Sequence, residues 1–256
     1  MEQYGICHLP LAPLRSHPDD TSEMVSQTLF GQTIRILDNT NPKWTLVRVC
    51  DDGYEAYIGN KQYQPISNYE VEHLNQHRQT VNRHGVRITR TDKDITFEIP
   101  LGSTLPKEKT FRFGTMEYQH SFTAYNDNSL IYTARSFLNA PYLWGGKSLF
   151  GIDCSGFTQT VFSAHEIQLL RDASQQATQG QTVTNLDQAR PADLAFFDND
   201  KGRIIHVGIL LADSQIIHAS GCVRIDRIDE KGIFNEEIGQ YTHHLAAIRR
   251  FFSFTE

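Results

Sequence analysis

The 256-residue chain lacks several patterns that mark common classes of protein. It has no long basic run, and its 24 Lys and Arg residues against 30 Asp and Glu residues give a net charge of −6. This balance argues against binding to nucleic acid through a basic patch. No apolar run approaches the roughly 20 residues that a membrane helix needs, so we expect no membrane partner.

The beginning of the chain also lacks the pattern of a secretion signal. Residues 1–10 contain no basic head followed by an apolar stretch. We therefore expect a cytoplasmic protein. If a signal peptide was removed before the sequence was recorded, the protein is instead secreted or periplasmic.

Cysteine is scarce, with four residues at Cys7, Cys50, Cys154 and Cys222. They form no C-x-x-C pair, so the usual spacing of a zinc site is missing. Four cysteines are too few for a disulfide scaffold in a chain of this length. We expect Cys7, Cys50 and Cys222 to be buried free thiols, and we expect no metal or other cofactor.

Short β-rich segments separated by Asp, Asn, Gly and Pro turns fill the first half of the chain. Runs such as 32–37 and 44–50 predict a small β-barrel over residues 1–68. A polar segment at 68–78 joins it to a second module. There the pattern of short strands repeats, and we predict a second small barrel over residues 79–126.

After residue 126 the pattern changes from strand-like to helical. Ser129 is a candidate cap for a first helix with apolar residues at helical spacing, and a second helix begins at Cys154. Strand-like runs follow, among them 204–211 and 215–218, which a short turn joins into a predicted hairpin. Helices followed by an antiparallel sheet indicate an α+β domain over residues 127–256.

The segment Asp153-Cys154-Ser155-Gly156-Phe157 places one cysteine at the start of a predicted helix. A thiol there feels the positive end of the helix dipole, which favours the thiolate and hence a nucleophile. A buried structural cysteine is the commoner fate, but polar neighbours on both sides of a core thiol would need buried partners. We therefore predict that Cys154 is the nucleophile of a cysteine peptidase.

Two histidines, His206 and His218, lie on the two strands of the predicted hairpin. They are seven and five residues from Asp213 at its tip, so both rings can lie on one face of the sheet if a bulge adjusts the register. This suits a base, His206, oriented by a partner, His218. Metal ligation by the pair is the alternative, and no third ligand at a suitable spacing supports it. We expect His243 and His244 at the surface.

Six motifs occur in the order found in the NlpC-type papain-like cysteine peptidases of cell-wall metabolism, and residues 129–252 resemble that family. The two predicted barrels resemble, more weakly, the bacterial SH3-like barrels that precede this domain in YkfC-type enzymes of the dipeptidyl-peptidase VI type. The six motifs are Tyr142-Leu143-Trp144-Gly145-Gly146, Asp153-Cys154-Ser155-Gly156-Phe157, Arg171-Asp172-Ala173-Ser174-Gln175-Gln176, Asp193-Leu194-Ala195-Phe196-Phe197, His206-Val207-Gly208-Ile209 and Ile217-His218-Ala219-Ser220.

The resemblance implies a γ-D-glutamyl-L-diamino acid endopeptidase, which cuts peptidoglycan stem peptides between D-Glu and diaminopimelate or lysine. It makes Cys154 the nucleophile, His206 the base and His218 the orienting third member of a Cys-His-His triad. Tyr142 would offer its hydroxyl beside the Cys154 backbone N–H as an oxyanion hole, with a packing aromatic as the alternative. Trp144 would shape the wall of the groove.

The resemblance also implies a site for the free amine of an N-terminal L-Ala. An ammonium that loses water needs an anionic partner, so a carboxylate must lie near it. A solvated glutamate and a barrel-packing tyrosine are the alternatives for the two candidates from the first barrel. We expect Arg171 and Asp172 to form an ion pair that braces the adjoining loop. The candidate amine-binding residues are Asp153, Ser155 and Ser174, with Glu23 and Tyr54 (or Tyr57) from the first barrel.

We expect a monomeric recycling peptidase that acts on small murein peptides with a free N-terminal L-Ala. One alternative is a secreted hydrolase that acts on the intact wall through its barrels. Another is a binding module with a decayed site, against which the intact Cys154, His206 and His218 argue. A thiol acyltransferase of similar fold is the most remote.

Overall fold

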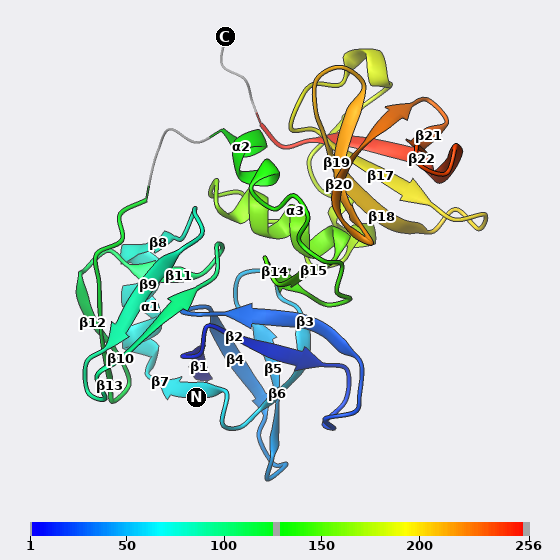
Figure 1. The fold of residues 1–256 in the computed structure, drawn as a ribbon. Coiled ribbons are helices and arrows are strands. Elements are labelled where there is room, and N and C mark those ends of the chain that lie inside the picture. The colour runs from blue at the N-terminus through cyan, green and yellow to red at the C-terminus, as the bar shows by residue number, and fades with distance from the viewer. Residues whose placement is uncertain (1, 125–128, 253–256) are drawn as a thin grey trace. The chain divides into compact units, whose positions relative to one another are not determined.

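The structure, a computed structural model, describes residues 2–124 and 129–252 (Figure 1). The chain divides into two compact units, one of Met1–Asp127 with Trp144–Ser148 and the other of Asn128–Leu143 with Leu149–Glu256. The boundary predicted after residue 126 lies outside the described residues. Within the described ranges, no helix has the length and apolar character needed to cross a membrane.

The first unit opens with the predicted succession of short strands. They form an antiparallel seven-stranded sheet in the order β3-β2-β6-β5-β4-β1-β7, and the turns between them carry the Asp, Asn and Gly residues that favour tight turns. The strands are β1 (Gln3–Cys7), β2 (Leu11–Arg15), β3 (Met24–Leu29), β4 (Thr33–Asp38), β5 (Trp44–Val49), β6 (Glu55–Gly59) and β7 (Tyr63–Ile66).

The polar segment after β7 forms helix α1 (Asn68–His77). Ser67 and Glu70 make a reciprocal capping box, in which each side chain accepts a backbone N–H of the other residue. Val71 and Leu74 are the buried residues of this helix. The segment expected to be a linker is therefore an amphipathic helix, and its Ser-x-x-Glu pattern was the signal for it.

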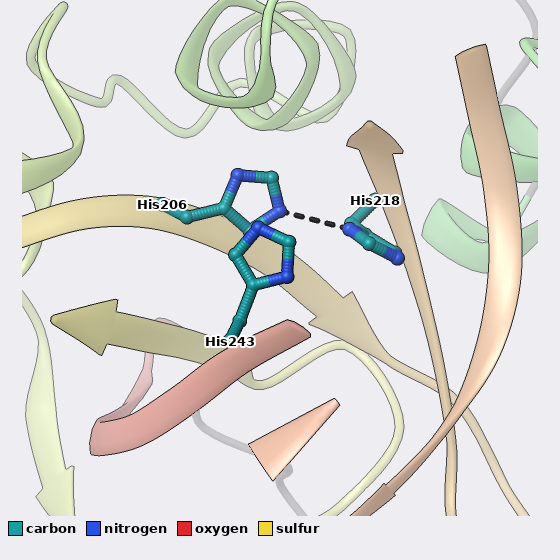
Figure 2. A group of neighbouring side chains, drawn as sticks. All are labelled: His206, His218 and His243. Carbon is teal, nitrogen blue, oxygen red and sulfur yellow. Dashed lines mark hydrogen bonds between the residues drawn. The ribbon is translucent and has the colours of Figure 1, made fainter. Parts of the chain in front are cut away.

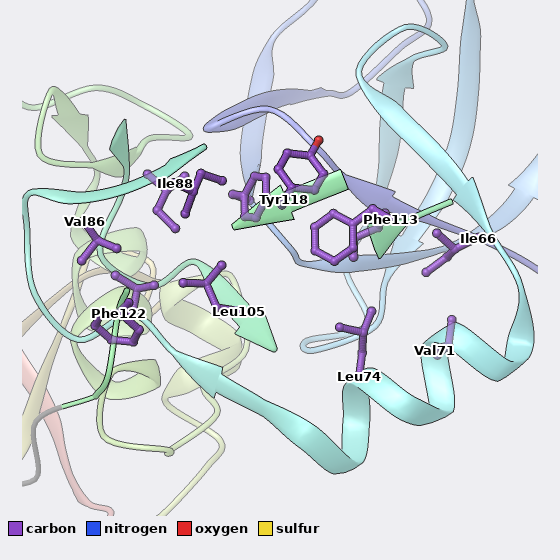
Figure 3. Close-up of a cluster of buried hydrophobic side chains, with 13 residues drawn as sticks. Ile66, Val71, Leu74, Val86, Ile88, Leu105, Phe113, Tyr118 and Phe122 are labelled. Atoms are coloured by element: carbon purple, nitrogen blue, oxygen red, sulfur yellow. The ribbon is translucent and has the colours of Figure 1, made fainter. Parts of the chain in front are cut away.

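The second predicted module consists of a four-stranded sheet, in the order β10-β9-β13-β12, and a two-stranded pair, β11-β8. Its core also includes Ile6 and Phe30 of the first module. Figure 3 shows Ile66, which also comes from the first module, together with Val71 and Leu74 of α1 in this cluster. Residues of the first module thus complete the core of the second, while the seven-stranded sheet keeps a separate core of its own. The strands are β8 (Arg78–Thr80), β9 (Val86–Arg90), β10 (Ile95–Ile99), β11 (Thr104–Pro106), β12 (Thr110–Phe113) and β13 (Met116–His120); β14 (Lys147–Ser148) also belongs to this unit.

The second unit begins with helices, as predicted. Ser129 accepts the backbone N–H of Tyr132 at 3.2 Å and caps α2 (Leu130–Arg135). Helix α3 (Cys154–Ser163) buries nearly every residue because it packs between α2 and the strands β18 and β19. A short helix, α4 (Ala173–Gln176), also packs on β18. Cys154 is thus the first residue of a helix that is buried along nearly its whole length.

The antiparallel sheet of the second unit runs in the order β16-β22-β17-β18-β19-β20-β21, and β21 also pairs with β22. Strands β17 to β22 therefore close into a ring of six. The predicted hairpin is β18–β19, and its tip contains Asp213 in a left-handed conformation. The elements are β15 (Gly151–Ile152), β16 (Gln181–Val183), the 3₁₀-helix η1 (Leu186–Gln188), β17 (Leu194–Asp198), β18 (Ile204–Leu210), β19 (Gln215–Ser220), β20 (Cys222–Asp229), β21 (Gly232–Asn235) and β22 (Gln240–Arg250).

All four cysteines are free thiols. Cys7 is buried, Cys222 is partly buried and Cys50 is exposed. The prediction that Cys50 is buried is therefore wrong, because it lies one residue beyond β5, at the turn Asp51-Asp52-Gly53.

Candidate active site

His206 and His218 lie on one face of the β18–β19 hairpin in a diagonal relation. The register pairs Gly208 with His218, so His206 is displaced by two residues along β18. No bulge occurs in this ladder; instead, Gly208 leaves the space opposite His218 open. A Cβ at Gly208 would lie only 2.8 Å from the His218 Cβ and 2.8 Å from Cδ1 of Ile216. The glycine between the two histidine positions thus lets the two rings meet.

The two imidazoles form the first part of a buried hydrogen-bonded chain. His206 Nε2 lies 2.8 Å from His218 Nδ1, and His218 Nε2 lies 2.9 Å from Asp226 Oδ2. An ionised carboxylate only accepts hydrogen bonds, so His218 carries its proton on Nε2. Its Nδ1 then accepts the Nε2–H of His206, and Nδ1 of His206 is left unprotonated. The chain therefore prepares His206 Nδ1 as a base.

Asp226 on β20 is a site residue that the sequence analysis missed. It is 8% exposed and accepts two further hydrogen bonds from the Arg224 guanidinium, at 2.8 and 3.0 Å. Burial raises the pKa of the Asp226 carboxyl, but the bonds from His218 and Arg224 outweigh it and hold that pKa below its usual value. Asp226 is therefore an anion at neutral pH. The Val and Ile content of residues 222–229 was the available signal for its strand.

The Cys154 thiol lies beside Val207, the residue that follows His206 on β18. The backbone of Val207 makes a hydrogen bond to the Cys154 thiol, which places the sulfur next to the strand position that follows His206. Burial, and then the charge of Asp153, raise the pKa of this thiol to about 12; the Val207 bond and the Arg171 charge oppose them. Burial and the neighbouring His218 and His243 hold the pKa of His206 well below its usual value.

These directions correct the prediction that the helix N-terminus favours a thiolate. Cys154 is 6% exposed and His206 is 6% exposed, so each pays a desolvation cost for carrying charge. Burial thus acts on the Cys154 thiol in the direction opposite to the helix dipole. Both directions favour a neutral thiol and a neutral imidazole over the charged pair.

Tyr142 lies close enough to the thiol to feel its charge. Burial raises the pKa of the Tyr142 hydroxyl to about 12, with further contributions from Cys154 and Asp153. A short bridge pairs Tyr142 with Ile152, two residues before the cysteine. Tyr142 is therefore a protonated donor near Cys154, and its oxyanion role stays a prediction.

Asp153 and Ser155 belong to a buried ion-pair network with Arg171. The Arg171 guanidinium binds Asp153 Oδ1 at 3.1 Å and Oδ2 at 2.6 Å, and it donates to Ser155 Oγ at 2.8 Å. Asp153 also caps α3 by accepting the Gly156 N–H at 2.6 Å. A substrate ammonium would have to share this carboxylate with Arg171. Amine binding by Asp153 and Ser155 stays a prediction.

Arg171 pairs with Asp153, and the ion pair expected between Arg171 and Asp172 stays a prediction. Arg171 is 1% exposed and reaches back to Asp153, while Asp172 is the N-cap residue of α4 and forms a capping box with Gln175. Ser174 is exposed in the first turn of α4. Its predicted contact with substrate is untested.

The remaining predicted residues lie in the first unit. The indole N–H of Trp144 donates to Glu23 Oε1 at 2.6 Å, and both side chains are exposed. Tyr54 is partly buried and packs on the core of the seven-stranded sheet. Their roles toward a substrate stay predictions.

His243 was expected at the surface, and this prediction is wrong. It is partly buried on β22, and its ring stacks on His206 with centroids 4.1 Å apart and planes inclined by 27°. Burial, then the neighbouring His218, lower the pKa of His243 to about 4. Figure 2 shows its ring beside the hydrogen-bonded pair. Closure of the six-strand ring brings β22 to this position, and the order of residues within one strand gives no sign of it.

Comparison with known proteins agrees with the geometry of both units. Residues 139–241 match the model of the NlpC/P60 family, and residues 14–62 match that of the bacterial dipeptidyl-peptidase SH3 domain. The chain carries an NlpC/P60 domain. This domain contains Cys154, His206, His218 and Asp226, whereas His243 lies just beyond the matched residues.

Several relatives match this chain over most of its length. A gamma-D-glutamyl-L-lysine dipeptidyl-peptidase of Bacillus subtilis is 29% identical, over 89% of this chain and 81% of its own. The dipeptidyl-peptidase 6 of Lysinibacillus sphaericus is 26% identical, over 86% of this chain and 90% of its own. An NlpC/P60 family protein from Bacillus cereus has the same fold, with a TM-score of 0.78 at 22% identity over 96% of this chain and 99% of that chain. NlpC/P60 peptidases are cysteine peptidases, and the SH3 match confirms the first predicted barrel as an SH3-like domain.

Proposed function

We propose that this protein is a cysteine endopeptidase that hydrolyses the bond between γ-D-Glu and an L-diamino acid in murein peptides with a free N-terminal L-Ala. The observation that carries the proposal is the buried hydrogen-bonded chain from Asp226 through His218 to His206. The backbone of Val207, the residue after His206, makes a hydrogen bond to the Cys154 thiol. The names of the relatives support the γ-D-glutamyl specificity and the release of a dipeptide from the N-terminus.

The proposed triad is Cys154, His206 and His218. His206 Nδ1 takes the thiol proton as the Cys154 sulfur attacks the γ-carbonyl carbon of D-Glu. The resulting oxyanion accepts hydrogen bonds from the Cys154 backbone N–H and the Tyr142 hydroxyl, donors typically worth about 3 kcal/mol each. His206 then gives its proton to the departing amine of the diamino acid, leaving a thioester.

Water completes the reaction. His206 Nδ1 takes a proton from the attacking water, the second tetrahedral intermediate collapses, and the sulfur leaves as a thiol after His206 returns the proton. His218 keeps the His206 ring in place, and the Asp226 carboxylate offsets the positive charge of each imidazolium intermediate.

We further propose that the substrate is a small, free peptide of cell-wall recycling and that the enzyme acts in the cytoplasm as a monomer. Glu23 offers a carboxylate whose orientation the Trp144 indole fixes, so it is our preferred partner for the L-Ala ammonium. Asp153, Ser155, Ser174 and Tyr54 complete the proposed amine-binding set.

The test compares L-Ala-γ-D-Glu-diaminopimelate, the same peptide with lysine, the N-acetylated peptide and intact peptidoglycan as substrates. Mass spectrometry of the products should show L-Ala-γ-D-Glu released from the free peptides and little cleavage when the amine is blocked. The Cys154→Ala protein is the matched control and should be inactive. Equal cleavage of blocked peptide or intact polymer would overturn the recycling role, and an active Cys154→Ala variant would overturn the mechanism.

A further inference from the structure

Three imidazole rings from three strands converge at the proposed active site. His206 comes from β18, His218 from β19 and His243 from β22 (Figure 2). One ring nitrogen of each lies within 4.8 Å of those of the other two. The third nitrogen ligand that sequence spacing failed to supply is therefore present in the fold.

The arrangement suits a borderline divalent ion. Zinc binds imidazole nitrogen at about 2.0–2.1 Å, so two nitrogens on one tetrahedral ion lie about 3.3 Å apart. The His206 and His218 nitrogens are 2.8 Å apart and all three ligand nitrogens lie within 4.8 Å of one another, so small movements of the rings would bring them to this spacing around one ion. The outer nitrogen of His218 already bonds to the Asp226 carboxylate. That carboxylate–histidine pairing orients histidine ligands in zinc sites.

We propose that His206, His218 and His243 form an inhibitory binding site for zinc or a similar borderline divalent cation. An ion on Nε2 of His206 displaces the proton that this nitrogen donates to His218. Neutral His206 then carries its proton on Nδ1, the nitrogen that must accept the thiol proton. Metal binding and catalysis thus need opposite tautomers of one ring, and the ion blocks the base without touching the substrate.

The inhibitory consequence depends on the proposed peptidase function, whereas the binding site itself does not. The site also differs from zinc capture by a catalytic thiol, because its ligands are three nitrogens and Cys154 is not among them. Removal of the thiol should therefore leave zinc binding in place. Removal of His243 should weaken it.

Direct binding is measured by equilibrium dialysis of ⁶⁵Zn²⁺ against the full chain with Cys154→Ala. His243→Phe in that background keeps a flat ring over His206 but has no ligand nitrogen, and we expect the affinity to fall about tenfold or more. His244→Phe, at the exposed neighbour, is the matched control and should leave the affinity unchanged. Thermal melting checks that each variant folds. Loss of binding in Cys154→Ala alone, or an unchanged affinity in His243→Phe, would overturn the site.

Inhibition is measured separately on the peptide substrate. Zinc should inhibit the protein with Cys154 intact, and EDTA should restore the rate. His243→Phe should need about tenfold or more zinc for the same inhibition, while Mg²⁺, which prefers oxygen ligands, should have no effect. Equal zinc sensitivity of the His243→Phe and His244→Phe proteins would overturn the inhibitory role. A protein that cleaves no peptide would refute the proposed function, and the dialysis result would still decide the zinc site.

Discussion

His206 Nε2 lies 2.8 Å from His218 Nδ1, and both rings are almost fully buried. Asp226, 2.9 Å from His218 Nε2, determines that this nitrogen of His218 is protonated. The contact between the two histidines then determines which nitrogen of His206 is protonated. Each link in the chain is diagonal across a strand pair: the registers pair Gly208 with His218 and His218 with Arg224. Three adjacent strands thus align an anion, an orienting ring and a base.

The Asp226 carboxylate should set the tautomer of His206. In Asp226→Asn, the side-chain amide can donate to His218 Nε2, so His218 donates from Nδ1 and pushes the His206 proton onto the nitrogen that should act as base. We expect kcat to fall by about 10- to 1,000-fold with KM nearly unchanged. The loss should stay below the roughly 10⁴-fold reported when an aspartate contacts the catalytic histidine directly, because Asp226 acts through His218.

Steady-state kinetics on the peptide substrate checks this positioning role. Asp226→Glu keeps the charge and should recover part of kcat. Asp198→Asn, which alters an acid that bonds the exposed His244, is the control and should change neither constant. A rise in KM with full kcat, or loss of activity only through unfolding, would contradict the tautomer mechanism.

Gly208 should be required for the two histidines to meet. In Gly208→Ala the added Cβ would lie 2.8 Å from the His218 Cβ and from Ile216, deep in the second unit. We expect the free energy of unfolding to drop by about 1–3 kcal/mol and kcat to fall as the rings separate. Thermal unfolding and activity measure the two effects. Ile205 on the same strand is exposed, so Ile205→Ala is the control and should keep full activity. Normal activity in Gly208→Ala as well would refute the steric argument.

Much of the proposed catalytic set could be predicted from local sequence. The turn at Asp213 marks the centre of the hairpin, and counting outward from it along both strands places His206 and His218 on one face. Ser129 and the apolar spacing after it predict α2, and Cys154 begins its helix as expected. These features depend on contacts close in sequence, which turns, caps and periodicity determine.

The features that sequence missed depend on contacts distant in the chain. Asp226 and His243 reach the site only because β20 lies beside β19 and β22 closes the ring through β21 and β17. Arg171 pairs with Asp153, 18 residues away, although a carboxylate stands next to it in the sequence. The thiol pKa was mispredicted for a similar reason. The helix position is local, but burial depends on how the whole second unit packs.

Removing one partner of the buried Arg171–Asp153 ion pair should strongly destabilise the second unit. Arg171→Met leaves the Asp153 carboxylate buried without its cation, and we expect a loss of about 3–5 kcal/mol in the free energy of unfolding. The double change Arg171→Met with Asp153→Asn removes the stranded charge and should be less destabilised than Arg171→Met alone. Urea unfolding measures the free energy of unfolding of the unchanged protein, Arg171→Met and the double variant.

An exposed ion pair supplies the comparison. Arg112 and Glu117 lie on the surface of the first unit, so Arg112→Met should cost less than about 1 kcal/mol. If Arg171→Met costs no more than Arg112→Met, the buried pair is not a stability determinant. A double variant less stable than Arg171→Met would likewise contradict the stranded-charge explanation.

The reactivity of Cys154 should report a neutral resting thiol. Burial raises its pKa to about 12, and the pKa of His206 is held well below its usual value, so the thiolate–imidazolium form is rare near neutral pH. The rate of Cys154 alkylation by iodoacetamide, followed by mass spectrometry, should rise about tenfold per pH unit from about pH 7 to 9. The buried Cys7, whose pKa is also raised to about 12 by burial, should stay unlabelled while the protein is folded. A rate for Cys154 that is already constant between about pH 5 and 7 would instead reveal a preformed ion pair, and the helix dipole would then outweigh burial at this residue.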